Sequence, residues 1–281
     1  MRSTRPFRLL ATLALAFTAC LAVVAATLYL SRHAISAHID REYARAVERA
    51  NEVEVGCGKP WAHRGFTGKA RENSIESVQA AFARGACGVE VDILYDRQDR
   101  RFYVAHGRPY PLFDGQPLAL AALLEATGHL GHFWLDAKDL KKLPPWHARD
   151  AVAELVQLVE AHGLRERVLV ESAQPVYLGW LAAAGLHTSL LVSPTEHKYP
   201  EPVYLANIHA IKWMYYRYGP FSALSMNFSR FTPRTEALLG DEVPLLLSTV
   251  NDRALLARLV ADPQVEVVLT DRSYYDVSGH D

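Results

Sequence analysis

From residue 60 onward, short runs of β-branched and aromatic residues alternate with longer stretches in which apolar residues recur every three to four positions. This alternation is typical of βα units stacked around a parallel sheet. The expected strands cover residues 61–65, 89–95, 133–138, 168–171, 188–192, 224–228, 245–250 and 265–270, with a companion strand at 102–106. Eight units over about 220 residues predict a (β/α)8 TIM barrel. An open, doubly wound sheet is disfavoured because no Gly-x-Gly-x-x-Gly follows the first strand.

The composition is that of an ordinary globular protein. The chain has 281 residues, of which 22% are charged and 50% hydrophobic, and its net charge is −1. Disordered chains combine low hydrophobicity with high net charge, and nucleic-acid-binding proteins have a basic excess. Three cysteines without a Cys-x-x-Cys pair are too few for a disulfide-built scaffold or a zinc site. We therefore expect a hydrophobic core, no nucleic-acid partner and no obligate protein partner.

The amino-terminal segment differs from the rest of the chain. Residues 9–30 are 22 consecutive uncharged and mostly apolar residues, preceded by Arg2, Arg5 and Arg8. As a helix, this segment would be about 33 Å long, which is enough to cross a bilayer. We expect an uncleaved transmembrane anchor, with a cleaved signal peptide and a buried core helix as the alternatives.

The arginines also predict the orientation of this anchor. Three of them adjoin the apolar run in a short tail, so we expect the amino terminus inside the cell. The protein would then be a single-pass membrane protein with an extracytoplasmic catalytic part. The predicted domains are residues 1–55, comprising the tail, the anchor and a helical stalk, and residues 56–281, comprising the barrel.

Titratable side chains gather where the predicted strands end. His63 and Arg64 end the first strand, Glu90 and Asp92 lie on the second, His106 ends the companion strand, Asp136 and Lys138 end the third, and Asp271 follows the last. The active site of a TIM barrel lies at the carboxyl ends of its strands. Unpaired charges in buried strands are costly, so we expect these residues to form a site.

Three carboxylates among these residues suit a divalent cation. In Val89-Glu90-Val91-Asp92, the alternation of a strand places both carboxylates on one face, which is the interior of a barrel. Two inward carboxylates repel each other unless a cation lies between them. Asp136 would complete an oxygen site suited to Mg²⁺ or Ca²⁺. The alternative is a structural ion-pair network with Arg64 and Lys138.

Two histidines are candidates for proton transfer. His63 and His106 lie at strand ends, and histidine titrates near neutral pH, so one could act as general base and the other as general acid. Arg64 and Lys138 add positive charge beside the carboxylates, a combination that suits a phosphate ester better than a carbonyl substrate. The chain has neither a Gly-x-Ser-x-Gly elbow nor a phosphate-binding Gly-x-x-x-x-Gly-Lys-Ser/Thr loop.

The order of these residues resembles that of the glycerophosphodiester phosphodiesterases. The resemblance covers about Trp61 to Arg272 and rests on His63-Arg64-Gly65, Glu72-Asn73-Ser74, Glu90-Val91-Asp92, His106, Asp136-Ala137-Lys138 and Thr270-Asp271. It implies a (β/α)8 barrel that depends on Ca²⁺ or Mg²⁺. By this resemblance, His63 and His106 would be the acid/base pair, and Arg64 and Lys138 would contact the phosphate. Glu90, Asp92 and Asp136 would hold the metal, and Glu72 would support the site.

The chain also departs from this family at three positions. Gly107 follows the second histidine where the family usually has Asp, Asp136 stands where it commonly has Glu, and Ser248 stands where it often has Trp. His-Gly and Asp-x-Lys resemble the sphingomyelinase D-like phospholipases, although those usually lack Arg after the first histidine. We therefore expect a divergent phosphodiesterase acting on glycerophosphodiesters or related lipid head groups. The alternatives are a cyclising phospholipase of the sphingomyelinase D-like kind and an inactive, membrane-tethered binding barrel.

Cys57 and Cys87 are a candidate disulfide pair. Cys57 lies shortly before the first predicted strand and Cys87 shortly before the second, so both fall near the amino-terminal rim of the barrel. We expect a bridge if the barrel lies in an oxidising compartment. The alternative is a pair of reduced thiols.

Overall fold

The computed structural model describes residues 12–27, 29–30, 59–66, 68, 70–219, 221–240 and 243–275. The chain divides into two units, Met1–Arg45 and Ala46–Asp281. The predicted domain boundary after residue 55 lies outside the described residues.

The first unit contains a described helical segment, in which residues 12–27 and 29–30 are helical and exposed. Among the described residues, no helix is long and apolar enough to cross a membrane. The predicted transmembrane helix over residues 9–30 is therefore not found. Residues 9–11 and 28 of that stretch lie outside the described residues.

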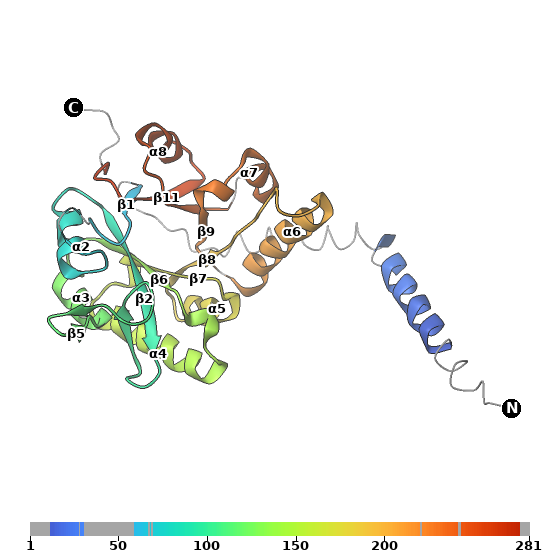
Figure 1. The fold of residues 1–281 in the computed structure, drawn as a ribbon, viewed down its shortest axis with the longest axis horizontal. Helices are drawn as coiled ribbons and strands as arrows, with labels where there is room; N and C mark the ends of the chain where they lie inside the picture. Colours follow the sequence, from blue (N-terminus) through green and yellow to red (C-terminus); the bar gives the residue numbers. More distant parts are fainter. Residues whose placement is uncertain are drawn as a thin grey trace. The chain divides into compact units, whose positions relative to one another are not determined.

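The second unit is a closed barrel of eight parallel strands (Figure 1). These strands are β1 (Pro60–Ala62), β2 (Gly88–Asp96), β6 (His132–Ala137), β7 (Val168–Ser172), β8 (His187–Leu191), β9 (Ala223–Asn227), β10 (Leu245–Ser248) and β11 (Val265–Thr270). Each pairs in parallel with the next, and β1 closes the barrel by pairing with both β11 and β2. The predicted (β/α)8 TIM barrel is confirmed.

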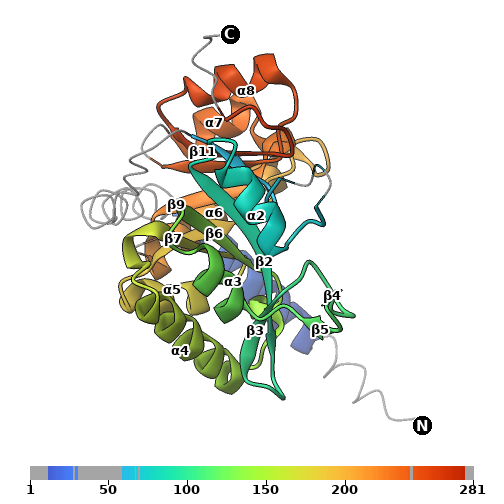
Figure 2. The same cartoon turned by 90° about the vertical axis from the view of Figure 1, so that its left-hand side faces the viewer.

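Helices surround these strands (Figures 1 and 2). They are α2 (Ile75–Phe82), α3 (Leu120–Thr127), α4 (Pro145–Ala161), α5 (Pro175–Ala183), α6 (Glu201–Tyr218), α7 (Pro233–Leu239) and α8 (Arg253–Val260). Several begin with strong local signals: Ser74, Thr232 and Asp252 accept hydrogen bonds from first-turn N–H groups, and α4, α5 and α7 each have proline at their first position.

The predicted companion strand corresponds to β3, which pairs with the end of β2 outside the ring of eight parallel strands. β3 (Arg101–Val104) pairs antiparallel with the last four residues of β2, and β4 (Leu112–Phe113) and β5 (Gln116–Pro117) form a small hairpin beyond it. Figure 2 shows this excursion extending past the other strands. The N–H of Ala105 donates to the Asp92 carbonyl at 2.9 Å, which returns the chain to the barrel just before His106. The predicted excursion is therefore confirmed, and it places His106 beside Asp92.

Alternation along the strands produces two apolar layers. Val89 and Val91 face outward into the core between strands and helices, where α2 contributes Val78 and Ala81. The inward residues form a second cluster, made of Trp61, Trp134, Leu169, Ala223, Leu246, Val267 and Leu269. A Cβ on Gly88 would lie 2.2 Å from the Trp61 indole, so only glycine leaves room for that ring.

The polar residues lie one layer further along the same inward face. Asp92, Asp136 and Glu171 are partners in the register of β2, β6 and β7, and they follow Glu90, Trp134 and Leu169, which are also partners, by two residues each. The apolar cluster thus fills the barrel beneath the carboxylates. This packing fixes where the acidic side chains can point.

The cysteine prediction falls partly on undescribed residues. Cys87 is disulfide-bonded, whereas Cys57, its predicted partner, lies outside the described residues. Cys20 is a free, exposed cysteine.

Candidate active site

The turn after β1 contains His63-Arg64-Gly65 and brings the Arg64 backbone into contact with Glu90. The strand ends at Ala62, so the prediction that it continues to Gly65 is wrong. Arg64 and Gly65 adopt φ values of 54° and 78°, which leave the extended region. This conformation lets the Arg64 N–H donate to Glu90 Oε2 at 3.0 Å. Gly65 is required because a Cβ there would lie 2.5 Å from the Ser77 Oγ.

Glu90, Asp92 and Asp136 converge inside the barrel. Their carboxylates have ligand atoms within 4.8 Å of one another, and all three residues are buried. Burial, together with the charges of Asp92 and Asp136, raises the pKa of Glu90 well above its ordinary value. Burial also raises the pKa of Asp136. The predicted clustering of these three carboxylates is therefore present in the structure.

Two cations contact the same carboxylates. Lys138 Nζ lies 3.0 Å from Asp92 Oδ1 and also pairs with Asp136, while Arg64 Nε lies 2.9 Å from Asp92 Oδ2. Although burial opposes it, the charges of Lys138 and Arg64 lower the pKa of Asp92. The ion-pair network considered as an alternative thus exists, but it leaves Glu90 with a strongly raised pKa. The cluster is short of positive charge, so its oxygen ligands fit a hard divalent cation.

Asn73 holds Asp92 in place, a role that the sequence analysis did not assign. The Asp92 N–H donates to Asn73 Oδ1 at 3.0 Å, and Asn73 Nδ2 donates to Asp92 Oδ2 at 2.9 Å. Asn73 is buried and has a φ of 55°, a left-handed conformation that asparagine tolerates better than most residues. The motif Glu72-Asn73-Ser74 therefore supports the acidic cluster through its middle residue as well.

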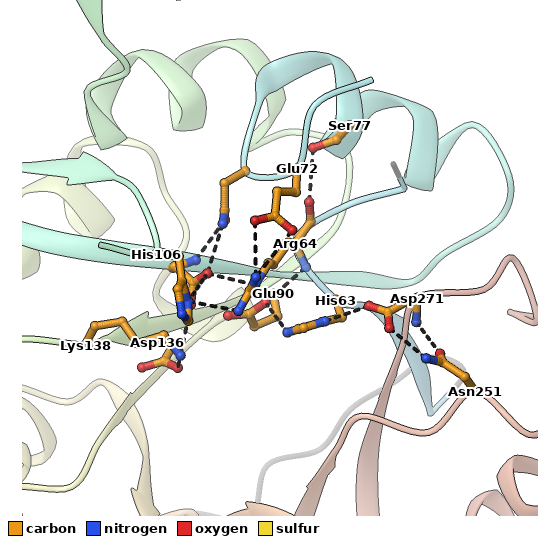
Figure 3. Close-up of polar contacts among 12 residues, drawn as sticks. His63, Arg64, Glu72, Ser77, Glu90, His106, Asp136, Lys138, Asn251 and Asp271 are labelled. Atoms are coloured by element: carbon orange, nitrogen blue, oxygen red, sulfur yellow. Dashed lines mark hydrogen bonds and ion pairs between the residues drawn. The ribbon is translucent and has the colours of Figure 1, made fainter. Parts of the chain in front are cut away.

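His63 is oriented from the far side by Asp271. His63 Nδ1 lies 2.7 Å from Asp271 Oδ1, and His63 Nε2 lies 3.9 Å from Glu90 Oε2 (Figure 3). Asn251 Nδ2 donates to Asp271 Oδ2 at 2.7 Å, and the Asp271 N–H donates to Asn251 Oδ1 at 2.8 Å. The hydrogen bond from His63 lowers the pKa of Asp271, although burial opposes this. An ionised Asp271 accepts a hydrogen bond from Nδ1–H of His63, and Nε2 of the same ring then faces the carboxylates.

His106 faces the cluster from the other side. Its Nδ1 lies 2.8 Å from Arg64 Nη2 and 3.2 Å from Asp92 Oδ2. We assign Nδ1 as the acceptor in the neutral ring, because the guanidinium can only donate and is nearer than Asp92 Oδ2, which has Arg64 Nε as a donor; the ring proton is then on Nε2. The side chain is 56% exposed, so Nε2 can reach a substrate.

Glu72 contacts Arg64, as the supporting role predicted for it requires. Arg64 Nη1 donates to both Glu72 oxygens, at 3.2 and 3.3 Å. The guanidinium thus lies between Glu72 and His106 (Figure 3). All eight predicted site residues therefore lie in one contiguous network: His63, Arg64, Glu72, Glu90, Asp92, His106, Asp136 and Lys138.

A fourth buried carboxyl group, Glu171, was missed. It stands beside Asp136 in the register of β6 and β7 and is 4% exposed. Burial, reinforced by the charge of Asp136, raises the pKa of Glu171 well above its ordinary value. The run Val168-Leu169-Val170-Glu171 contained the signal, because the alternation argument applied to Glu90 also places Glu171 inside the barrel.

Comparisons with known proteins find similarity to the family that the sequence motifs resemble. The model of the glycerophosphoryl diester phosphodiesterase family matches residues 63–106, the span from the first histidine to the second. The resemblance stated from the sequence is therefore confirmed over this span. No curated protein matches the chain.

Solved structures share the fold at low sequence identity. A glycerophosphodiester phosphodiesterase from Parabacteroides distasonis has a TM-score of 0.56 and 20% identity, over 76% of this chain and 92% of its own. A phosphodiesterase from Oleispira antarctica, in complex with the product sn-glycerol-3-phosphate, has a TM-score of 0.60 and 16% identity, over 81% and 98%. A glycerophosphodiester phosphodiesterase from Thermotoga maritima has a TM-score of 0.56 and 17% identity, over 77% and 95%.

The class of protein follows from fold and site together: a (β/α)8 barrel with an acidic cluster and two histidines at the carboxyl ends of its strands. Within that class, the chain is similar to the glycerophosphodiester phosphodiesterases, by the family model over residues 63–106 and by its fold over most of its length.

Proposed function

We propose that the chain is a phosphoric diester hydrolase that cleaves glycerophosphodiesters by two-histidine acid/base catalysis with a bound divalent cation. The observation that supports this most strongly is the position of His63 and His106, which contact the acidic cluster from two sides with their Nδ1 atoms already engaged. Each ring therefore has its Nε2 left for the substrate. In His63 this nitrogen has a free lone pair, and in His106 it holds a proton.

Glu90, Asp92 and Asp136 are the groups that would hold Ca²⁺ or Mg²⁺. A bound divalent cation supplies Lewis acidity and draws phosphoryl oxygens and a hydroxyl or water together. Glu90 in particular would gain from a cation, because its carboxyl is buried and its one hydrogen-bond donor among the described residues is the Arg64 N–H.

His63 is the general base in this proposal. Its Nδ1–H donates a hydrogen bond to Asp271, so its Nε2 has a free lone pair that faces the acidic cluster. It removes the proton from the attacking water, or from a hydroxyl of the substrate. Asn251 keeps Asp271 in place through two hydrogen bonds, which fixes the ring orientation during the transfer.

His106 is the general acid. With Nδ1 accepting from Arg64, its Nε2 proton is available to the leaving alkoxide. Arg64 and Lys138 place positive charge beside the cluster, where phosphoryl oxygens would gather. The leaving alcohol therefore lies on the His106 side of the site.

The test is a panel of glycerophosphodiesters and lysophospholipids assayed with purified protein in Ca²⁺, in Mg²⁺ and in chelator. Glycerophosphodiesters are the first choice because the Oleispira antarctica phosphodiesterase of similar fold was crystallised with sn-glycerol-3-phosphate. We expect metal-dependent release of a phosphomonoester. Phosphorus-31 NMR separates this product from the cyclic phosphate that a sphingomyelinase D-like reaction would leave. No turnover on any diester would favour the inactive binding barrel instead.

We also propose that the barrel lies outside the cytoplasm. The disulfide at Cys87 supports this, because disulfides persist in oxidising compartments. Labelling of intact cells with a membrane-impermeant reagent tests it, since an extracytoplasmic barrel reacts without lysis and a cytoplasmic one does not.

A further inference from the structure

A cavity of about 350 Å³ opens beside His106. It lies between the β2–β3 excursion and the segment that follows β6. Leu94, Tyr95 and Leu143 form its apolar part, and His106 and Lys138 belong to both the cavity and the site described above. Any group bound there is thus next to the acid that protonates the leaving alcohol.

The lining of this cavity is strongly basic. Arg97, Arg108, Lys138 and Lys142 line it, against a single lining carboxylate, Asp139. Lys138 is already paired with Asp92 and Asp136. The other three cations, Arg97, Arg108 and Lys142, form no ion pair with Glu90, Asp92 or Asp136.

The nearby carboxylates pair with Arg108 and not with the other two cations. Asp139 Oδ1 accepts from the Tyr95 N–H at 3.0 Å, and Asp139 Oδ2 and Asp96 Oδ2 lie 3.5 and 3.9 Å from Arg108 Nη2. Among the described residues, no carboxylate lies within 4.0 Å of the charged nitrogens of Arg97 or Lys142. Two cations therefore face the cavity without a counter-ion from the described part of the chain.

Arg108 is held rigidly at the wall of the cavity. Its Nη2 donates to the Tyr95 carbonyl at 2.9 Å and to the Tyr110 hydroxyl at 2.7 Å, and the guanidinium lies over the Tyr110 ring at 5.0 Å. Arg108 is paired with Asp96 and Asp139, so Arg97 and Lys142 supply the unbalanced positive charge that a phosphate group would meet in the cavity.

We propose that this cavity is a subsite for a second phosphate, located on the alcohol that leaves during cleavage. The chain would then prefer glycerophosphodiesters whose head group has its own phosphate over those with an uncharged head group. This inference rests on the function proposed above, because it takes His106 as the acid that protonates the leaving alcohol.

A matched pair of substrates tests the subsite. The ratio of kcat/KM for glycerophosphoinositol 4-phosphate to that for glycerophosphoinositol measures the contribution of the second phosphate alone. We expect a ratio of roughly 10 or more in the wild type, since one charge-assisted hydrogen bond is worth about a factor of ten. A ratio near one would overturn the subsite while leaving the proposed phosphodiesterase activity intact.

Adjacent lysines provide the control. Lys142 lines the cavity, whereas Lys141, in the same short helical turn, does not. Lys142→Gln, alone or with Arg97→Gln, should lower the ratio about tenfold, and Lys141→Gln should leave it unchanged. Equal effects of Lys141→Gln and Lys142→Gln would show a diffuse surface charge and contradict the subsite.

A binding measurement separates this inference from the proposed activity. Calorimetry on the full-length His63→Ala protein, whose cavity lining is intact, compares the affinities of the same two compounds without turnover. We expect the phosphorylated compound to bind roughly tenfold more tightly, and Lys142→Gln to remove the difference. Equal affinities would overturn the subsite whether or not the wild-type protein is active.

Discussion

His63 Nδ1 and Asp271 Oδ1 lie 2.7 Å apart, although 208 positions of sequence separate them. Closure of the barrel between β1 and β11 brings them together, because Ala62 and Thr270 are paired in register. The carboxylate of Asp271 therefore determines which nitrogen of His63 holds the proton. The proposed general base depends on a residue from the last strand of the barrel.

Asp271→Asn should lower kcat by about 100-fold, the lower range of a general-base contribution. An asparagine amide can donate to Nδ1, which would leave the ring proton on Nε2, where the base must be free. Steady-state kinetics at saturating metal measure the effect. Asp114→Asn is the control, because Asp114 is exposed and asparagine tolerates its φ of 50°. An unchanged kcat in Asp271→Asn would show that His63 does not need this orientation.

Asn73→Gly should lower the free energy of unfolding by about 1–3 kcal/mol, because it takes the side-chain acceptor from the buried Asp92 N–H and one donor from Asp92 Oδ2. Glycine retains the left-handed backbone of φ 55°, so the variant isolates the loss of the amide. Urea denaturation measures the stability, and calorimetry measures the affinity for Ca²⁺ or Mg²⁺, which should also fall. Wild-type stability and metal affinity together would contradict the role assigned to Asn73.

Divalent cations should stabilise the wild-type protein. A cation at about 100 times its Kd adds about 2.7 kcal/mol to the free energy of unfolding by mass action. Asp136→Asn should remove most of the resulting rise in Tm, whereas Asp150→Asn, at an exposed ion pair with Arg100, should not. Absence of a Tm shift with any divalent cation would argue against the acidic cluster as a metal site.

Glu171→Gln should flatten the pH dependence of stability in the metal-free protein. The pKa of Glu171 is raised in the folded state, so its contribution to the free energy of unfolding is present below about pH 4.5 and is lost as pH rises through the folded pKa. The neutral amide has no such titration. Urea denaturation in chelator from pH 5 to 9 should therefore show a smaller decline for the variant, and equal declines would contradict the assignment.

The cysteine chemistry gives a further check. Cys87 is disulfide-bonded and Cys20 is free, so a thiol reagent should label Cys20 but not Cys87 in native, oxidised protein. Peptide mapping after reduction identifies the second sulfur, which the sequence predicts to be Cys57. Native labelling of Cys87 would show that the bridge is absent.

Much of the barrel was predictable because strand periodicity is a local property. Alternation along Val89-Glu90-Val91-Asp92 places the carboxylates inward, and the valines pack outward against α2 as expected. The end of β1 was misjudged because Arg64 leaves the strand to donate its N–H to Glu90, a contact that no local pattern reveals.

The supporting contacts of the site were harder to predict. Asn73 and Asp271 stood in recognised motifs, but their partners depend on how the first strand meets the second and the last. The amino-terminal prediction rested on 22 uncharged, mostly apolar residues and on the arginines before them, and the described residues contain no helix that is both long and apolar enough to span a membrane.

The central claim is that His63 and His106 perform the proton transfers. The most direct test is the rate of glycerophosphodiester hydrolysis by His63→Ala and His106→Ala, each first shown to retain the wild-type Tm shift with divalent cation. We predict that each variant loses between about 100- and 10,000-fold in kcat. A near wild-type rate in either variant, with metal binding intact, would contradict the two-histidine mechanism.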